Sequence, residues 1–238
     1  MSHYNIAFIN EVDSTNTFLK ELVKSQNLEA PYCVSASKQI NGKGQREKTW
    51  ESEPFSNVLA SFLITSLSDL KELPRLNNAA ALAVVETLDS LGVKNIEVKW
   101  PNDIFVSGKK IAGILTENVI ASQRVKFTVV GIGLNVNQLL FKNFIATSVC
   151  MELAKDIDIV EVLHKLYDSF YHFIYQETDS LLMRVNNLLY KQGESVTFDV
   201  AGRMKEYTIE RIMINGNISV QKGGISYELE HHKVKWIK

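Results

Sequence analysis

The segment richest in chemistry-bearing side chains is residues 39–52, which read Gln-Ile-Asn-Gly-Lys-Gly-Gln-Arg-Glu-Lys-Thr-Trp-Glu-Ser. It has no apolar period, so it cannot be a core helix or a buried strand. Gly42 and Gly44 permit backbone shapes closed to other residues and let the chain approach a ligand closely. Trp50 offers a flat face for stacking, and positive charge comes from Lys43, Arg46 and Lys48. These residue types suit an adenine nucleotide and an activated carboxylate, although composition alone favours a solvated basic hairpin.

A short polar run, Asp13-Ser-Thr-Asn16, precedes apolar residues at helical spacing. The simplest interpretation is a helix N-cap. The alternative is that Ser14, Thr15 and Asn16 present small polar groups at a helix N-terminus. There they can satisfy the donors and acceptors of a ligand head group.

Polar groups also occur beside predicted strands. Lys99-Trp-Pro-Asn-Asp103 fits a strand end and a turn, but it could also line a cleft that holds a nucleotide or a metal. Lys110 precedes the apolar run Ile111–Leu115, so we expect its side chain to lie against a buried strand. Gly131-Ile-Gly133 indicates close strand packing, with the amide of Asn135 just beyond it.

Several familiar motifs are absent from the sequence. A dinucleotide fingerprint would need glycine where Glu47 stands after Gly42-Lys-Gly44, and again where Val136 stands after Gly131-Ile-Gly133. No Walker A segment and no Gly-x-Ser-x-Gly elbow occurs. No metal site is predicted, because the histidines and cysteines make no ligand pattern.

Composition indicates an ordinary globular protein. The chain has 238 residues and a net charge of −1, which gives no reason to expect general attraction to nucleic acids or membranes. Cys33 and Cys150 make no disulfide framework, which fits a reducing compartment. No secretory signal opens the chain, and the longest apolar run, Ala79–Val85, is too short to span a bilayer. We therefore expect a soluble cytoplasmic protein.

Periodicity predicts helices and strands over most of the first 190 residues. Helices are expected over Thr17–Lys24, from Pro74 to near Gly92, over Ile157–Glu177 and over Ser180–Tyr190. Strands are expected over Tyr32–Ser37, Asn57–Thr65, Ile96–Trp100 and Lys126–Ile132, with a hairpin that joins Ile104–Val106 to Ile111–Val119.

The chain changes character after Gln192-Gly193. Short strand-like pieces separated by glycine or asparagine turns follow, at Ser195–Phe198, Glu206–Ile214, Ile218–Gln221, Ser226–Leu229 and Lys233–Ile237. They predict a small β-barrel, with the domain boundary near residue 190. The expected domains are therefore 1–190, which carries the polar segments described above, and 191–238, a small β-domain.

Taken in order, the polar segments resemble the biotin protein ligases (biotin–carboxyl-carrier-protein ligases). That family carries Ser-Thr-Asn near the start of its catalytic domain, then a Gln and a Gly-Arg-Gly-Arg-x-Gly-Arg-x-Trp loop. Lys-Trp-Pro-Asn-Asp, Lys-x-Ala-Gly-Ile-Leu and Gly-x-Gly-x-Asn follow. The matching residues are Ser14–Asn16, Gln39, Gly42–Trp50, Lys99–Asp103, Lys110–Leu115 and Gly131–Asn135, with a further signature at Ala146–Val149. Ordered blocks across most of the first domain make this resemblance specific.

The departures from the family pattern lie in the glycine loop. Lys43 and Lys48 replace arginines, which preserves charge but loses the bidentate fork of a guanidinium. Gln45 stands where the family has its second arginine, and Arg46 follows it. Glu47 replaces a glycine. The local charge is therefore lower than the family's, and whether Arg46 replaces the missing arginine is left open.

The resemblance implies an α+β fold. A mixed-sheet catalytic domain of the biotin/lipoate ligase type, with helices packed on the sheet, would be followed by a small SH3-like β-barrel. It also implies a two-step reaction, in which biotin and ATP form biotinyl-5′-AMP and pyrophosphate, and a lysine of an acceptor domain then displaces AMP. Both steps need positioning and stabilisation of developing negative charge, to which Mg²⁺ on the phosphates would contribute.

The resemblance also implies site residues. Lys110 would be the catalytic cation. The biotin-binding set would be Ser14, Thr15, Asn16, Gln39, Gly42, Lys43, Gly44, Gln45, Lys110 and Gly113. The set that binds ATP and the adenylate would be Lys43, Gln45, Arg46, Lys48, Trp50, Asn102, Lys110 and Asn135.

The implied partner is the biotin carboxyl carrier domain of a biotin-dependent carboxylase, and a homodimer is compatible with the resemblance. Because the motifs begin at residue 13, the family's N-terminal DNA-binding region is expected to be missing, and with it direct DNA binding. Two alternatives stay open. One is a lipoate or octanoate ligase of the same fold, and the other is a biotin or adenylate sensor without transfer activity, which the changes at Gln45 and Glu47 would permit.

Overall fold

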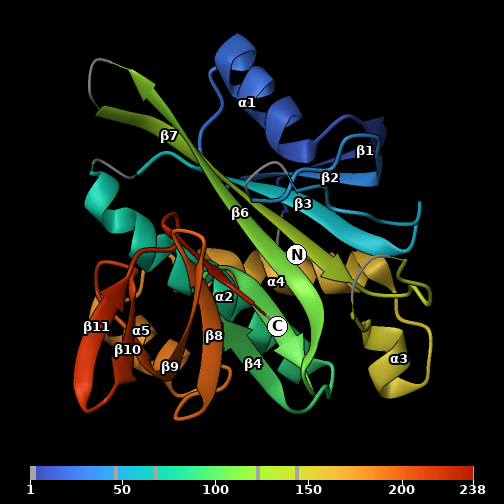
Figure 1. Cartoon of the computed structure of the whole chain (residues 1–238). Coiled ribbons are helices and arrows are strands. Elements are labelled where there is room, and N and C mark those ends of the chain that lie inside the picture. The colour runs from blue at the N-terminus through green and yellow to red at the C-terminus, as the bar shows by residue number, and fades with distance from the viewer. Residues whose placement is uncertain (1–3, 46–47, 67–68, 122–123, 143–144, 238) are drawn as a thin grey trace.

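Two β-sheets organise the chain (Figure 1). The structure is a computed structural model, and it describes residues 4–45, 48–66, 69–121, 124–142 and 145–237. Within these ranges, no helix is long and apolar enough to cross a membrane.

The larger sheet has seven strands in the order β1-β2-β3-β7-β6-β5-β4. Their bounds are β1 (Ile6–Val12), β2 (Tyr32–Gln39), β3 (Asn57–Ile64), β4 (Ile96–Lys99), β5 (Asp103–Val106), β6 (Lys109–Ala121) and β7 (Arg124–Asn135). β1 pairs with β2 in parallel, and all the other neighbours are antiparallel. The predicted mixed sheet is therefore confirmed, with the β5–β6 hairpin at its predicted place.

Helices cover both faces of this sheet (Figure 1). α1 (Thr15–Gln26) lies on one face, where Leu19 and Val23 pack against Val34, Leu63 and Phe127. The other face is covered by α2 (Leu73–Ser90) and α4 (Ile159–Phe173), with α5 (Thr178–Asn186) packed beside α2. The start of α1 agrees with the predicted cap, but Ser14 makes no side-chain capping hydrogen bond.

Local sequence explains how α2 and α4 pack. α2 begins with Pro74 in its first turn, and its buried alanines let it approach the sheet and α4 closely. α4 buries an aromatic face, with the rings of Phe62 and Phe170 4.5 Å apart. It is shorter than predicted. Asp158 caps its start by accepting a hydrogen bond from Val160 N, and its last residue is Phe173. The short helices η1 (Leu70–Glu72) and α3 (Val149–Leu153) were not predicted.

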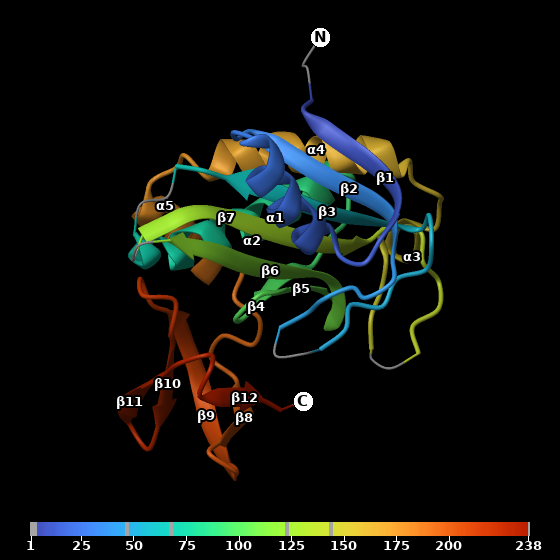
Figure 2. The ribbon, with the colours of Figure 1, turned by 90° about the horizontal axis from the view of Figure 1, so that it is seen from above.

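The smaller sheet contains five antiparallel strands in the order β11-β10-β9-β8-β12. They are β8 (Ser195–Val200), β9 (Arg203–Ile212), β10 (Ile218–Lys222), β11 (Ile225–Leu229) and β12 (Val234–Trp236), close to the predicted pieces. This sheet lies beside the β4 and β5 end of the larger sheet (Figure 2). Trp100, the residue after β4, donates from Nε1 to Gly216 O at 2.9 Å, so a side-chain hydrogen bond links the two parts.

Candidate functional site

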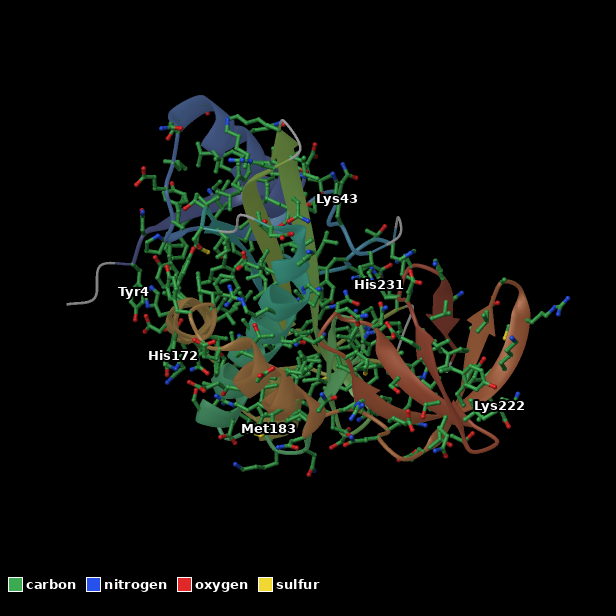
Figure 3. All side chains as sticks on the ribbon, turned by 90° about the vertical axis from the view of Figure 1, so that its left-hand side faces the viewer. Tyr4, Lys43, His172, Met183, Lys222 and His231 are labelled. Carbon is green, nitrogen blue, oxygen red and sulfur yellow. The ribbon has the colours of Figure 1, made fainter. Side chains whose placement is uncertain are left out.

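A cavity of about 580 Å³ lies between the larger sheet, residues 39–45 and 48–50, and the C-terminal strand β12. Most of the predicted site residues line it: Ser14, Thr15, Asn16, Gln39, Lys43, Gly44, Gln45, Lys48, Trp50, Asn102, Lys110 and Gly113. Figure 3 shows Lys43 and His231, from the two parts of the chain, on the same side of the molecule. The structure therefore brings residues from five separate blocks of sequence to one place.

The floor of the cavity lies on two neighbouring rows of residues across β3, β7 and β6, all of which line it except the buried Ser61. In the first row Ser61, Gly131 and Leu115 are register partners, and in the second row Leu59, Gly133 and Gly113 are partners. Side chains two apart on a strand point to the same face. Both glycines of β7 therefore face the cavity, and each lies beneath a side chain that comes from outside the sheet.

Asn16 lies over the first row. A Cβ at Gly131 would be 3.0 Å from Asn16 Cγ and closer still to its Oδ1. The amide of Asn16 reaches both neighbours of Gly131, because Nδ2 donates to Leu115 O at 3.2 Å and Oδ1 accepts from Ser61 Oγ at 2.6 Å. Asn16 is only 3% exposed. Because residue 131 is glycine, the buried amide of Asn16 can lie this close to β7.

The polar groups around Asn16 contain more acceptors than protons. Gln39 Oε1 accepts from Thr15 N at 2.8 Å and from Thr15 Oγ1 at 3.1 Å. Ser61 Oγ lies within reach of both Thr15 Oγ1 and Asn16 Oδ1, but its single proton can serve only one of them at a time. At least one lone pair stays open in this cluster, so it is complementary to a ligand that donates N–H groups.

Lys110 is one of the cations that line the cavity. It lies at the start of β6, just after a tight turn in which Ser107 and Gly108 both have positive φ. Its Nζ forms an ion pair with Asp103 Oδ1 at 2.6 Å, and both side chains are about three-quarters buried. The expectation that Lys110 lies against a buried strand is confirmed, and its ammonium group lies where it can meet an anionic ligand.

Residues 39–45 and 48–50 form the two arms of a hairpin that folds over the cavity. Trp50 N donates to Gly42 O at 2.8 Å, and Gly44 N donates to Lys48 O at 2.6 Å. The indole of Trp50 lies on the second row of the floor, so that a Cβ at Gly133 would be 2.7 Å from Cζ2. Lys110 Nζ is 5.3 Å from the centroid of the same ring. The segment is therefore a hairpin whose tryptophan lines the cavity, and its contact with a ligand stays a prediction.

We predict that Gly133→Ala lowers the efficiency of the reaction in this cavity by about tenfold, because the methyl group forces Trp50 and the hairpin off the floor. The same substitution in a Trp50→Ala background should change the efficiency by less than about twofold, since the clashing ring is gone. Steady-state kinetics of the four proteins measures this. Additive losses from the two substitutions would contradict the assigned contact.

Some predicted residues are not brought to the cavity. Gly42 does not line it, although its carbonyl holds Trp50 N. Asn135 is buried and donates from Nδ2 to Thr147 O at 3.0 Å, so it holds the segment before α3. Their predicted ligand contacts stay predictions. Arg46 and Glu47 lie outside the described residues.

Other lining residues were missed by the sequence analysis. They come mostly from the far side of the cavity: Lys99, Trp100, Asp103, Phe105, His231, Val234, Lys235, Trp236 and Ile237. The ammonium group of Lys99 lies 4.8 Å from the ring centroid of Phe105 and 5.2 Å from that of Trp236, which links β4 to β12. Lys99, Trp100 and Asp103 had a sequence signal in the Lys-Trp-Pro-Asn-Asp block, whereas no pattern marked the C-terminal strand.

A metal site assembled by the protein alone is not found among the described residues, where no group of three histidine, cysteine, aspartate or glutamate side chains could hold an ion. Among the described lining residues the carboxylate is that of Asp103, which forms an ion pair with Lys110. Asp103 could contribute a single oxygen ligand to an ion that is also held by a ligand's phosphates.

Comparison with known families gives one match that covers more than half of the chain. Residues 8–137 match the Biotin/lipoate A/B protein ligase family. Over 127 residues the chain is 35% identical to the bifunctional ligase/repressor BirA of Bacillus spizizenii, a match that covers 53% of this chain and 39% of that protein. Over 129 residues it is 32% identical to the biotin–[acetyl-CoA-carboxylase] ligase of Paracoccus denitrificans, covering 52% of this chain and 51% of that protein. The chain thus spans between two fifths and half of the length of these relatives.

Among solved structures, the biotin protein ligase of Aquifex aeolicus in complex with biotin and ATP superposes with a TM-score of 0.82. The superposition covers 99% of this chain and 100% of that one, at 23% identity. It confirms the predicted fold over both parts of the chain, the mixed-sheet part and the small C-terminal sheet.

Proposed function

The chain belongs to the biotin/lipoate A/B protein ligase family, and from this premise we propose that it is a biotin protein ligase. It would activate biotin with ATP to give biotinyl-5′-AMP and then transfer the biotinyl group to a lysine of a biotin carboxyl carrier domain. The observation that carries this proposal is the proton-poor cluster of Thr15, Asn16, Gln39 and Ser61 at one end of a cavity that Lys110 also lines.

The chemistry of that cluster favours biotin over lipoate. The ureido ring of biotin has two N–H donors and a carbonyl, whereas the dithiolane ring of lipoate has no hydrogen-bond donor. Lipoate would offer no N–H to the open lone pair of Asn16 Oδ1, so a site that presents this acceptor favours the ring that can donate to it. Ser14 and the first turn of α1 frame the same end of the cavity.

The first chemical step needs no protein nucleophile. The biotin carboxylate attacks the α-phosphorus of ATP, and the bond to the bridging oxygen breaks so that pyrophosphate leaves. Lys110 stabilises the negative charge that builds up between carboxylate and phosphate, and the backbone of the hairpin from Lys43 to Gln45 covers the product. Mg²⁺ held by the phosphates and Asp103 would supply further positive charge.

The second step uses the same cavity from its open side. The unprotonated amine of the acceptor lysine attacks the carbonyl carbon of the mixed anhydride, AMP leaves with the bridging oxygen, and the amine gives up a proton. The hairpin keeps water away from the anhydride until the acceptor arrives. Trp50 and Asn102 are the residues proposed to contact the nucleotide, and Lys48 would add charge at its phosphate.

We further propose that residues 1–190 form the catalytic domain and residues 191–238 a small β-domain that completes the cavity wall. The separate hydrogen-bonded sheets support this division. The acceptor would be a carrier domain of a biotin-dependent carboxylase, in keeping with the name of the Paracoccus relative. Free thiols at Cys33 and Cys150 fit the reducing cytoplasm proposed as its location.

Pyrophosphate release measured with biotin and with lipoate, each with and without a carrier domain, tests the proposal. We expect release with biotin alone and labelling of the carrier lysine when the domain is added. Release with lipoate but not with biotin would make the chain a lipoate ligase. Release with biotin and no labelling of several carrier domains would favour the sensor alternative.

A further inference from the structure

The orientation of the Asn16 amide decides what the polar end of the cavity can bind. Both protons of Nδ2 are used, one by Leu115 O at 3.2 Å and one by Glu117 Oε2 at 2.8 Å. Only Oδ1, which also faces Ser61, keeps an unused lone pair. Any ligand that hydrogen-bonds to Asn16 in this orientation must therefore donate a proton to it. A flipped amide would present protons instead and would oppose the N–H groups of a ureido ring.

Glu117 is the charged group that touches this amide from behind. It lies on β6 two residues beyond Leu115, next to Val129 in the sheet register, and does not line the cavity. Its second oxygen, Oε1, accepts from Lys20 Nζ on α1 at 2.7 Å. The side chains of Lys20 and Glu117 are only 21% and 27% exposed. The pair thus fixes Glu117 with one oxygen toward α1 and the other toward Asn16.

The electrostatic surroundings keep Glu117 ionised. Burial on its own would raise the pKa of this carboxyl group, but hydrogen bonds from Lys20 and Asn16, together with the charges of Lys20 and Lys43, outweigh burial and hold the pKa below its ordinary value. An ionised carboxylate only accepts hydrogen bonds. It therefore attracts Nδ2 of Asn16 and repels Oδ1.

We infer that Glu117, tethered by Lys20, is a positioning residue that sets the hydrogen-bonding polarity of Asn16 and thereby selects a head group that donates N–H. The inference rests on the proposed function, in which that head group is the ureido ring of biotin. Glu117 does not line the cavity, and its hydrogen-bonded contact with a lining residue is the one to Asn16. No motif in the sequence marked either member of the pair.

Biotin binding measured by calorimetry tests this role directly, without ATP or an acceptor. Glu117→Ala should weaken biotin binding by about tenfold, because the amide loses the group that orients it. The affinity for ATP should change by less than about twofold. Glu86→Ala is the matched control, since it removes the ion pair to Arg184 between α2 and α5, away from the cavity, and should leave biotin affinity unchanged.

A charge swap separates positioning from simple stabilisation. In the double variant Lys20→Glu with Glu117→Lys, the ion pair can form again, so thermal stability should return to near that of the wild type. The new lysine can only donate hydrogen bonds and would turn Oδ1 of Asn16 toward itself. Biotin affinity should therefore stay at least as weak as in Glu117→Ala.

The possible failures can be told apart. A wild-type protein that neither binds biotin nor releases pyrophosphate with it would refute the proposed function. A wild-type protein that binds biotin, together with a Glu117→Ala variant that binds it equally well, would refute the positioning role alone. Recovery of biotin affinity in the charge-swapped variant would also refute it, because the pair would then be purely structural.

Discussion

Replacing Lys110 by alanine is expected to lower the rate of biotin-dependent pyrophosphate release by about a thousandfold while leaving the fold intact. The ammonium group of Lys110 lies directly beside the carboxylate of Asp103 at the cavity wall. Removing one preorganised group that stabilises developing charge costs roughly two to three orders of magnitude in comparable enzymes. The fold should survive, because the side chain is partly exposed and makes one ion pair rather than core contacts.

Lys109→Ala is the matched control for this prediction. Lys109 is the neighbouring residue on β6, carries the same charge, and is exposed outside the cavity. We expect it to keep wild-type activity. Single-turnover pyrophosphate release, with circular dichroism to check the fold, measures both variants. Full activity in Lys110→Ala, or an equal loss in Lys109→Ala, would show that the charge at position 110 has no special role.

Strands of the larger sheet and the helices on it could be predicted from the sequence where burial of one face gives the apolar residues a regular spacing. β3 is buried along its whole length and was found close to its predicted bounds. α4 has a continuous apolar face and was found inside its longer predicted range. β1 was missed because it is an edge strand that is only partly buried, and Asn10 and Glu11 interrupt its pattern. α3 has five residues, which is too short for a helical period to show.

The candidate site could be predicted where chemistry is concentrated in short blocks. The Ser-Thr-Asn run, the glycine loop and Lys110 converge because each lies at the end of a strand or the start of a helix that meets the same floor. Ser61 and Glu117 could not be predicted, because each is a polar residue in an ordinary strand whose role depends on what lies above the sheet. The contribution of Trp236 depends on how the two sheets meet, which no local pattern encodes.

Gly131→Ala is expected to weaken biotin binding by about a hundredfold. The added methyl group would lie 3.0 Å from Asn16 Cγ and closer to its Oδ1, which is far inside van der Waals contact. Asn16 cannot retreat, because hydrogen bonds to Ser61, Leu115 and Glu117 hold its amide on three sides. The clash should also destabilise the fold by about 1–3 kcal/mol, as is usual when atoms are forced into a packed site.

The stability of the double variant shows whether this clash is the cause. With Asn16→Ala already present, the atoms that collide with the new methyl group are gone, so Gly131→Ala should cost little further stability in urea unfolding. If Gly131→Ala lowers the free energy of unfolding equally in the wild type and in Asn16→Ala, the strain lies elsewhere in the sheet. The affinity for ATP should change little in Gly131→Ala, because Lys110 and Trp50 lie over the neighbouring row. If Gly131→Ala weakens the binding of biotin but not of ATP, then the head group is recognised over the row of Gly131. The carboxylate would be activated over the separate row of Gly133 in the same sheet.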